Sequence, residues 1–115
     1  GLESYFSKLV LSSAFGRSKP DPSIFLYAAQ EAGFLPEECL YVGNSPLKDI
    51  FGASNAGFLG TVQIEYLEDI DDVKDPGVAP DYYIKSMEEL PEIIQSYLNK
   101  NWILLNIIFI LLDNN

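Results

Sequence analysis

The feature that most constrains the fold of this chain is an alternation of short apolar runs with amphipathic helical patterns. Residues 39–42 (CLYV) form a continuous apolar run that stops at Gly43. Continuity of this kind indicates a strand that is buried on both faces. Runs at 6–13, 60–66 and 81–86 also read as strands. Strands separated by helices predict βαβ units, so we expect an α/β fold with a three-layer, Rossmann-like parallel sheet and flanking helices.

The intervening helices are marked by signals at their ends. Asp21 is a good N-cap, followed by a proline at the first helical position, and the apolar stripe that follows ends at Gly33. A second helix is predicted over 45–57, where a serine and a proline begin it and a glycine ends it. Ser86 and Glu89 form a capping box for a last helix.

Composition excludes several functional classes. The chain has 115 residues and a formal net charge of −10, which disfavours binding to nucleic acids and to anionic membranes. It contains no histidine, which excludes a Ser-His-Asp or Cys-His nucleophile, and with Cys39 as the single cysteine it leaves no ordinary zinc site. Chemistry with hard metals and oxygen ligands fits this inventory best. The single cysteine and the N-terminal residues, which lack a signal-peptide pattern, predict a cytoplasmic location.

The C-terminal residues depart from the pattern before them. Residues 102–112 are almost wholly apolar, but the run is far shorter than the roughly 20 residues that span a bilayer. They could form an extra buried element, a dimer contact or an appended segment, and their Asn, Ile and Leu bias favours the last. We therefore divide the chain into a core region at 1–100 and an atypical apolar tail at 101–115. Self-association through the tail or an exposed sheet edge is expected.

Polar residues follow two of the predicted strands. Lys19 lies in the loop after the first strand, and Asn44 follows Gly43 at the end of the second, with Asp49 about one helical turn later. Because ligands of open α/β sheets bind at the carboxyl ends of the strands, these groups are expected to face one crevice. A lysine and two oxygen ligands predict a site for a phosphate and Mg²⁺. Ser45 either orients ligands there or serves as the helix N-cap.

These motifs resemble a known family. The segments KPDP (19–22), GNSPLKD (43–49) and GASNAGF (52–58), with PDYYIKSMEELPEII (80–94), are similar to the C-terminal part of the core in haloacid dehalogenase (HAD) superfamily hydrolases. The likeness covers about residues 1–100 and is nearest to the phosphatase-rich branch with a helical cap.

The resemblance implies a role for each matching residue. Lys19 matches the lysine that neutralises the nucleophilic aspartate and the phosphoryl oxygens, so it is our catalytic and substrate-binding candidate. Asn44 and Asp49 match the motif that holds Mg²⁺, and Ser45 lies beside it as a substrate-binding candidate. The implied activity is a Mg²⁺-dependent phosphatase that acts on a small phosphorylated metabolite through an aspartyl-phosphate.

Two departures from the family pattern keep other functions open. Asn44 stands where the phosphatases usually carry Asp, which should weaken Mg²⁺ binding; the metal-independent dehalogenases of the superfamily use Asn in this region, so dehalogenation is an alternative. The Asp-x-Asp-x-Thr motif that supplies the nucleophile does not occur in the chain, and the DIDD segment at 69–72 and the serines at 12 and 13 are poor substitutes. We therefore expect a fragment that is inactive alone, or a non-catalytic remnant or binding piece.

Overall fold

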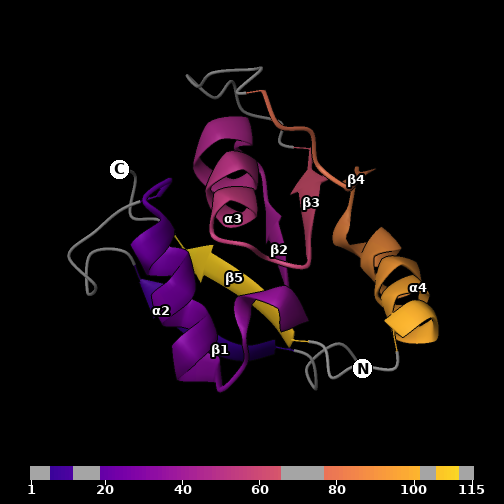
Figure 1. Ribbon diagram of the computed structural model, residues 1–115. Coiled ribbons are helices and arrows are strands. Elements are labelled where there is room, and N and C mark those ends of the chain that lie inside the picture. Colours follow the sequence, from indigo (N-terminus) through magenta and orange to yellow (C-terminus); the bar gives the residue numbers. More distant parts are fainter. Residues whose placement is uncertain (1–5, 12–18, 66–76, 102–105, 112–115) are drawn as a thin grey trace.

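The strands of this chain form one parallel sheet. The computed structural model describes residues 6–11, 19–65, 77–101 and 106–111 (Figure 1). Its strands are β1 (Phe6–Leu11), β2 (Cys39–Gly43), β3 (Gly60–Ile64), β4 (Tyr82–Ile84) and β5 (Asn106–Leu111). They pair in the order β1-β5-β2-β3-β4, and every neighbouring pair is parallel. The predicted α/β class with a parallel sheet is confirmed.

The helices begin and end where their capping residues lie. The α-helices are α2 (Pro22–Ala32), α3 (Gly52–Asn55) and α4 (Leu90–Asn101). A π-helical segment at Pro46–Phe51 leads into α3, and a 3₁₀ turn at Met87–Glu89 leads into α4. Another 3₁₀ turn spans Pro36–Glu38. The Asp21 carboxylate accepts a hydrogen bond from the Ser23 backbone N–H, and Gly33 ends α2 in the left-handed conformation. Ser86 and Glu89 form the predicted capping box.

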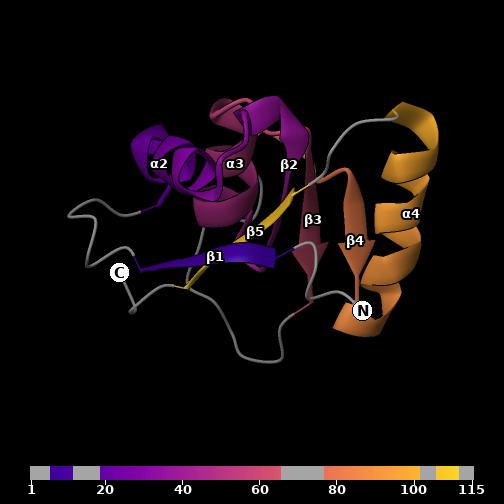
Figure 2. The same cartoon turned by 90° about the horizontal axis from the view of Figure 1, so that it is seen from below.

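Two hydrophobic clusters pack on opposite faces of the sheet. Alternate residues of β2 point to opposite faces, so Cys39 and Tyr41 join the cluster of α2 and α3, whereas Leu40 and Val42 join the cluster of α4. Figure 2 shows α2 and α3 on one side of the strands and α4 on the other. Every residue of β2 is buried, as its continuous apolar sequence predicts. The fold therefore has three layers, with β2 inside.

The apolar tail contributes a strand to the sheet. Residues of β5 pair with β2 on one side and with β1 on the other, with Leu40 opposite Ile107 and Val10 opposite Ile110. Of the three alternatives for the tail, the structure shows an additional element, which lies within the sheet. The division of the chain at residue 100 stays a prediction.

Some sequence features lie outside the described residues. These are the serines at 12 and 13, the DIDD segment at 69–72, and the tail residues at 102–105 and 112–115. Among the helices of the described residues, none has both the length and the apolar character needed to cross a bilayer.

Candidate functional site

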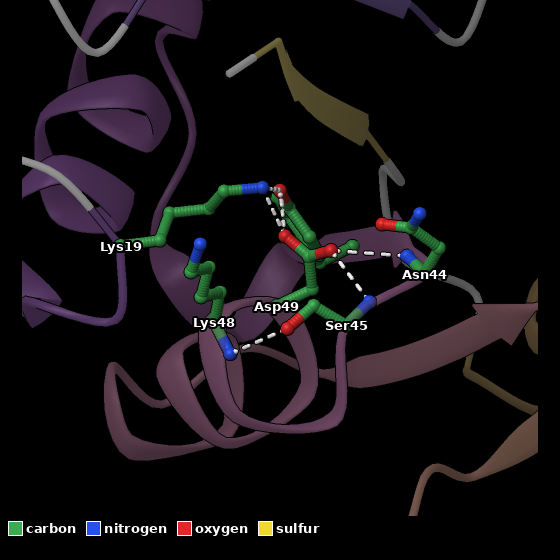
Figure 3. A network of polar contacts seen from close by, with 6 residues as sticks. Lys19, Asn44, Ser45, Lys48 and Asp49 are labelled. Carbon is green, nitrogen blue, oxygen red and sulfur yellow. Dashed lines mark hydrogen bonds and ion pairs between the residues drawn. The ribbon is translucent and has the colours of Figure 1, made fainter. Parts of the chain in front are cut away.

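A buried ion pair lies at the carboxyl end of β2. The Lys19 ammonium contacts the Oδ1 atom of Asp49, and both side chains are almost fully removed from solvent, with 3% and 1% of their surface exposed (Figure 3). Lys19 precedes α2 and Asp49 lies in the π-helical segment after β2, so the pair joins two elements that are 30 residues apart in sequence. This pair is the centre of the candidate site.

The carboxylate of Asp49 accepts hydrogen bonds from four donors among the described residues. Oδ1 accepts from the Lys19 ammonium and from the Tyr41 hydroxyl, the latter at 2.8 Å. Oδ2 accepts from the backbone N–H groups of Asn44 and Ser45, each at 3.0 Å. A carboxylate offers about four lone-pair sites, so these four donors occupy all of its acceptor sites. Asp49 therefore holds the loop after β2 and the Lys19 side chain at the same time.

Local sequence explains why Asp49 can lie this close to the strand. Gly43 ends β2, and a Cβ atom at this position would lie 2.4 Å from the Asp49 Cγ atom. The Ser45 hydroxyl caps the following segment by accepting a hydrogen bond from the Lys48 N–H at 3.0 Å. The glycine leaves room for the carboxylate, and the cap turns the chain so that Asp49 comes back under the end of the strand.

Opposing effects set the pKa of the Lys19 ammonium. Burial lowers the pKa of its ammonium below the usual value, and the positive charge of Lys48 lowers it further, whereas the neighbouring Asp49 carboxylate raises it. Burial is the largest of these effects, so the pKa of Lys19 is lowered overall. In Figure 3 the Lys48 side chain extends toward the Lys19 ammonium. A second cation therefore lies near the pair.

The donor set of the described residues does not by itself form a magnesium site. Both oxygens of Asp49 already accept two hydrogen bonds, so a metal ion there would have to displace a donor. The Asn44 side chain is half-buried and forms no hydrogen bond within the described residues, which leaves its amide oxygen available as one ligand. Over the same residues, no three His, Cys, Asp or Glu side chains gather as a metal site would require. Mg²⁺ binding by Asn44 and Asp49 stays a prediction.

Two residues of the site were not singled out from the sequence. Lys19, Ser45 and Asp49 come together as expected, and Asn44 lies on the opposite side of the carboxylate from Lys19 (Figure 3). The apolar run at 39–42 predicts Tyr41 only as a core residue, and Lys48 has no predicted role. Tyr41 could have been found, because a tyrosine in an otherwise apolar buried strand needs a partner for its hydroxyl. The role of Ser45 observed here is that of an N-cap, and substrate binding by it stays a prediction.

Comparison with known proteins identifies the family. Residues 1–57 match the family model for haloacid dehalogenase-like hydrolase. The fold matches the crystal structure of a HAD phosphatase from Thermococcus onnurineus with a TM-score of 0.63 and 33% identity, over 82% of this chain and 41% of that one. This chain belongs to the HAD superfamily. The recognition made from the sequence motifs is confirmed.

Other HAD relatives differ in activity. Glyceraldehyde 3-phosphate phosphatase from Methanopyrus kandleri is 38% identical over 97 residues, which cover 83% of this chain and 41% of the relative. A 2-haloacid dehalogenase from Pseudomonas syringae pv. Tomato DC3000 matches with a TM-score of 0.58 and 30% identity, over 75% of this chain and 36% of that one. This HAD chain thus spans about two fifths of the length of these relatives.

Proposed function

We propose that this chain binds the phosphoryl group of a small phosphorylated metabolite in the manner of a HAD phosphatase, with Lys19 as the binding and charge-stabilising residue. The observation that carries the proposal is the buried Lys19–Asp49 pair at the carboxyl end of β2. A lysine is rarely buried unless it is paired. An ammonium held at this edge of an α/β sheet is placed where such folds bind anionic ligands.

The chemistry of Lys19 follows from its surroundings. An ammonium in a site with little water interacts more strongly with phosphoryl oxygens than it would in bulk solvent. Asp49 keeps it in place and partly offsets the burial that lowers its pKa. Lys48 adds a second positive charge nearby. These residues bind and neutralise an anion, and none of them forms the covalent bond of a phosphatase reaction.

Turnover requires a nucleophile. The resemblance implies an aspartate carboxylate that attacks phosphorus and forms an aspartyl-phosphate, which water then hydrolyses. The Asp-x-Asp-x-Thr motif that supplies it does not occur in these 115 residues. We therefore expect this chain to bind phosphate without turning over substrate by itself.

We also propose that Mg²⁺ binds at this site. In HAD phosphatases the ion supplies charge neutralisation at the phosphoryl group. Asn44 offers a neutral oxygen ligand here, so we expect weak binding. Asn44→Asp should tighten Mg²⁺ binding roughly tenfold or more, measured by isothermal titration calorimetry, whereas Asn55→Asp, at an exposed position that ends α3, should not. Equal Mg²⁺ affinity in both variants would exclude position 44 as a ligand.

The first test of the proposal is phosphate binding. We expect inorganic phosphate to bind the whole chain in calorimetry, and Lys19→Met to weaken that binding at least about tenfold, since a charged hydrogen bond is lost. Lys85→Met is the control, because Lys85 is an exposed lysine at the end of β4. Phosphate binding that is absent in the wild type, or equal in the two variants, would overturn the proposal.

Dehalogenation is a second candidate, favoured by Asn44 and by the match to the 2-haloacid dehalogenase. Release of halide from a 2-haloacid in the presence of a chelator would support it, and would separate it from phosphatase chemistry. Phosphate binding without either activity would support the third function considered, a non-catalytic binding piece.

A further inference from the structure

The Tyr41 hydroxyl closes a three-membered network with the ion pair. It lies 2.9 Å from the Lys19 Nζ atom and 2.8 Å from the Asp49 Oδ1 atom, while Nζ also contacts Oδ1. An ammonium has no acceptor and a carboxylate has no donor, so the hydroxyl accepts from Lys19 and donates to Asp49. Both hydrogen-bonding capacities of the phenol are therefore directed at the same pair.

The ring that carries this hydroxyl is rigidly held. Tyr41 lies in β2 with no exposed surface. Its ring packs edge-to-face against Phe25 of α2, with centroids 5.1 Å apart, and against Phe58, at 6.2 Å. Phe25 and Phe58 also contact each other edge-to-face at 5.9 Å. Three aromatic rings from three parts of the chain thus fix the position of the Tyr41 oxygen.

The contact between Lys19 and Tyr41 is a hydrogen bond and not a cation–π interaction. The ammonium lies 5.5 Å from the ring centroid but 2.9 Å from the phenol oxygen. Those two distances place it beyond the hydroxyl and not over the face of the ring. The interaction therefore depends on the oxygen atom, which phenylalanine lacks although its ring would fill almost the same volume.

We infer that Tyr41 is a positioning residue for Lys19, because its hydroxyl, with Asp49, fixes the ammonium where it meets the phosphoryl group. A lysine side chain has four flexible carbons, and contact with Asp49 alone would leave the ammonium free to turn about one oxygen atom. A second fixed partner removes that freedom before the ligand arrives, and such preorganisation strengthens binding. This inference rests on the proposed function.

The test compares two tyrosine variants in the full-length chain. Tyr41→Phe removes the hydroxyl of the network, and Tyr97→Phe removes a partly buried hydroxyl in the cluster on the opposite face of the sheet. Each is titrated with inorganic phosphate by calorimetry, beside the wild type and Lys19→Met, and its folding is checked by thermal denaturation. We expect Tyr41→Phe to weaken phosphate binding roughly three- to tenfold, as for one hydrogen bond, and Tyr97→Phe to leave it unchanged.

A rescue experiment separates positioning from packing. Incorporation of 4-aminophenylalanine at position 41 restores a donor to Asp49 and a weaker acceptor for Lys19, so we expect phosphate affinity to recover in part from its value in Tyr41→Phe. Wild-type affinity in Tyr41→Phe, equal losses in Tyr41→Phe and Tyr97→Phe, or no rescue would each overturn the inference. If the wild type itself does not bind phosphate, or if Lys19→Met binds as tightly as the wild type, the proposed function fails instead.

Discussion

At the scale of single residues, Asp49 and Gly43 depend on each other. The carboxylate lies under the end of β2, where it accepts from two backbone N–H groups and from two side chains. That position exists because residue 43 has no side chain, since a Cβ atom would lie within 2.5 Å of three Asp49 atoms. A loop that could have been open to water is thereby tied to the lysine.

Asp49→Asn should be strongly destabilising although it is nearly isosteric. Whichever way the amide turns, its NH₂ group would face either the Lys19 and Tyr41 donors or the backbone donors of Asn44 and Ser45. Removing one partner of a buried pair lowers the free energy of unfolding by about 3–5 kcal/mol, measured by urea denaturation. Glu92→Gln is the control, since Glu92 is exposed. A loss as small as that of the control would contradict the role assigned to Asp49.

Gly43→Ala tests the close approach directly. The added methyl group would displace the Asp49 carboxylate, so both the free energy of unfolding, by about 1–3 kcal/mol, and phosphate affinity should fall. Gly60→Ala is the matched control, because its methyl group would meet the Tyr97 hydroxyl on the opposite face of the sheet at 2.1 Å. That variant should lose stability but keep phosphate affinity. Equal effects of both variants on affinity would show that the methyl group acts through general destabilisation.

At the scale of elements, the helix caps and the alternation of side chains along β2 decide how the helices pack on the two faces of the sheet. Helix α2 places its apolar stripe against one face of β2, and α4 places its own against the other. The stripes at 24–29 and 90–98 follow the helical period in the sequence, so these contacts could be anticipated. The π-helical segment at Pro46–Phe51 could not, because an ordinary helix has the same start signals.

The packing of α4 against β4 predicts that Tyr97 loses its proton only at unusually high pH. Burial, the charge of Asp81 and the neighbouring Tyr82 raise the pKa of Tyr97 from 10.0 to about 12. Between these values the unfolded chain has released this proton and the folded chain has kept it. The folded state then binds more protons, so the stabilisation from Tyr97 is present below pH 10.0 and is lost as pH rises through about 12.

Phenolate absorbance measures this titration in the folded protein. The wild type should show a step near pH 12 that Tyr97→Phe lacks and that Tyr83→Phe, which removes an exposed tyrosine, retains. Loss of that step in Tyr83→Phe, or its persistence in Tyr97→Phe, would assign it to another residue.

At the scale of the whole molecule, the sheet is continuous because β5 joins β1 to β2. β5 follows α4 in the sequence, yet this last strand lies between the first two in the sheet. Without it, β1 would have no partner strand among the described residues and β2 would have one unpaired side, which invites association with another chain.

Ile108→Pro should therefore disrupt the fold as a whole. Ile108 lies opposite Tyr41 in the ladder, and a proline removes a backbone donor from a strand that is paired on both sides. We expect loss of a cooperative thermal transition and formation of oligomers, measured by circular dichroism and light scattering. Ile108→Val keeps the N–H group and the branched side chain and should keep the thermal transition and the oligomeric state of the wild type. An Ile108→Pro variant that also keeps both would show that β5 is dispensable to the sheet.

The sequence by itself determined the parallel α/β class, the start and end of α2 and the capping box before α4, and it singled out Lys19 and Asp49 as candidate site residues, because periodicity, capping and motifs are local patterns along the chain. The tertiary structure alone decided that β5 lies between β1 and β2, that the Tyr41 hydroxyl bonds to both members of the ion pair, and that the Asp49 carboxylate accepts hydrogen bonds from four donors. The physical reason is that strand order and the direction of a buried hydroxyl depend on contacts between segments tens of residues apart. No pattern confined to either segment specifies them.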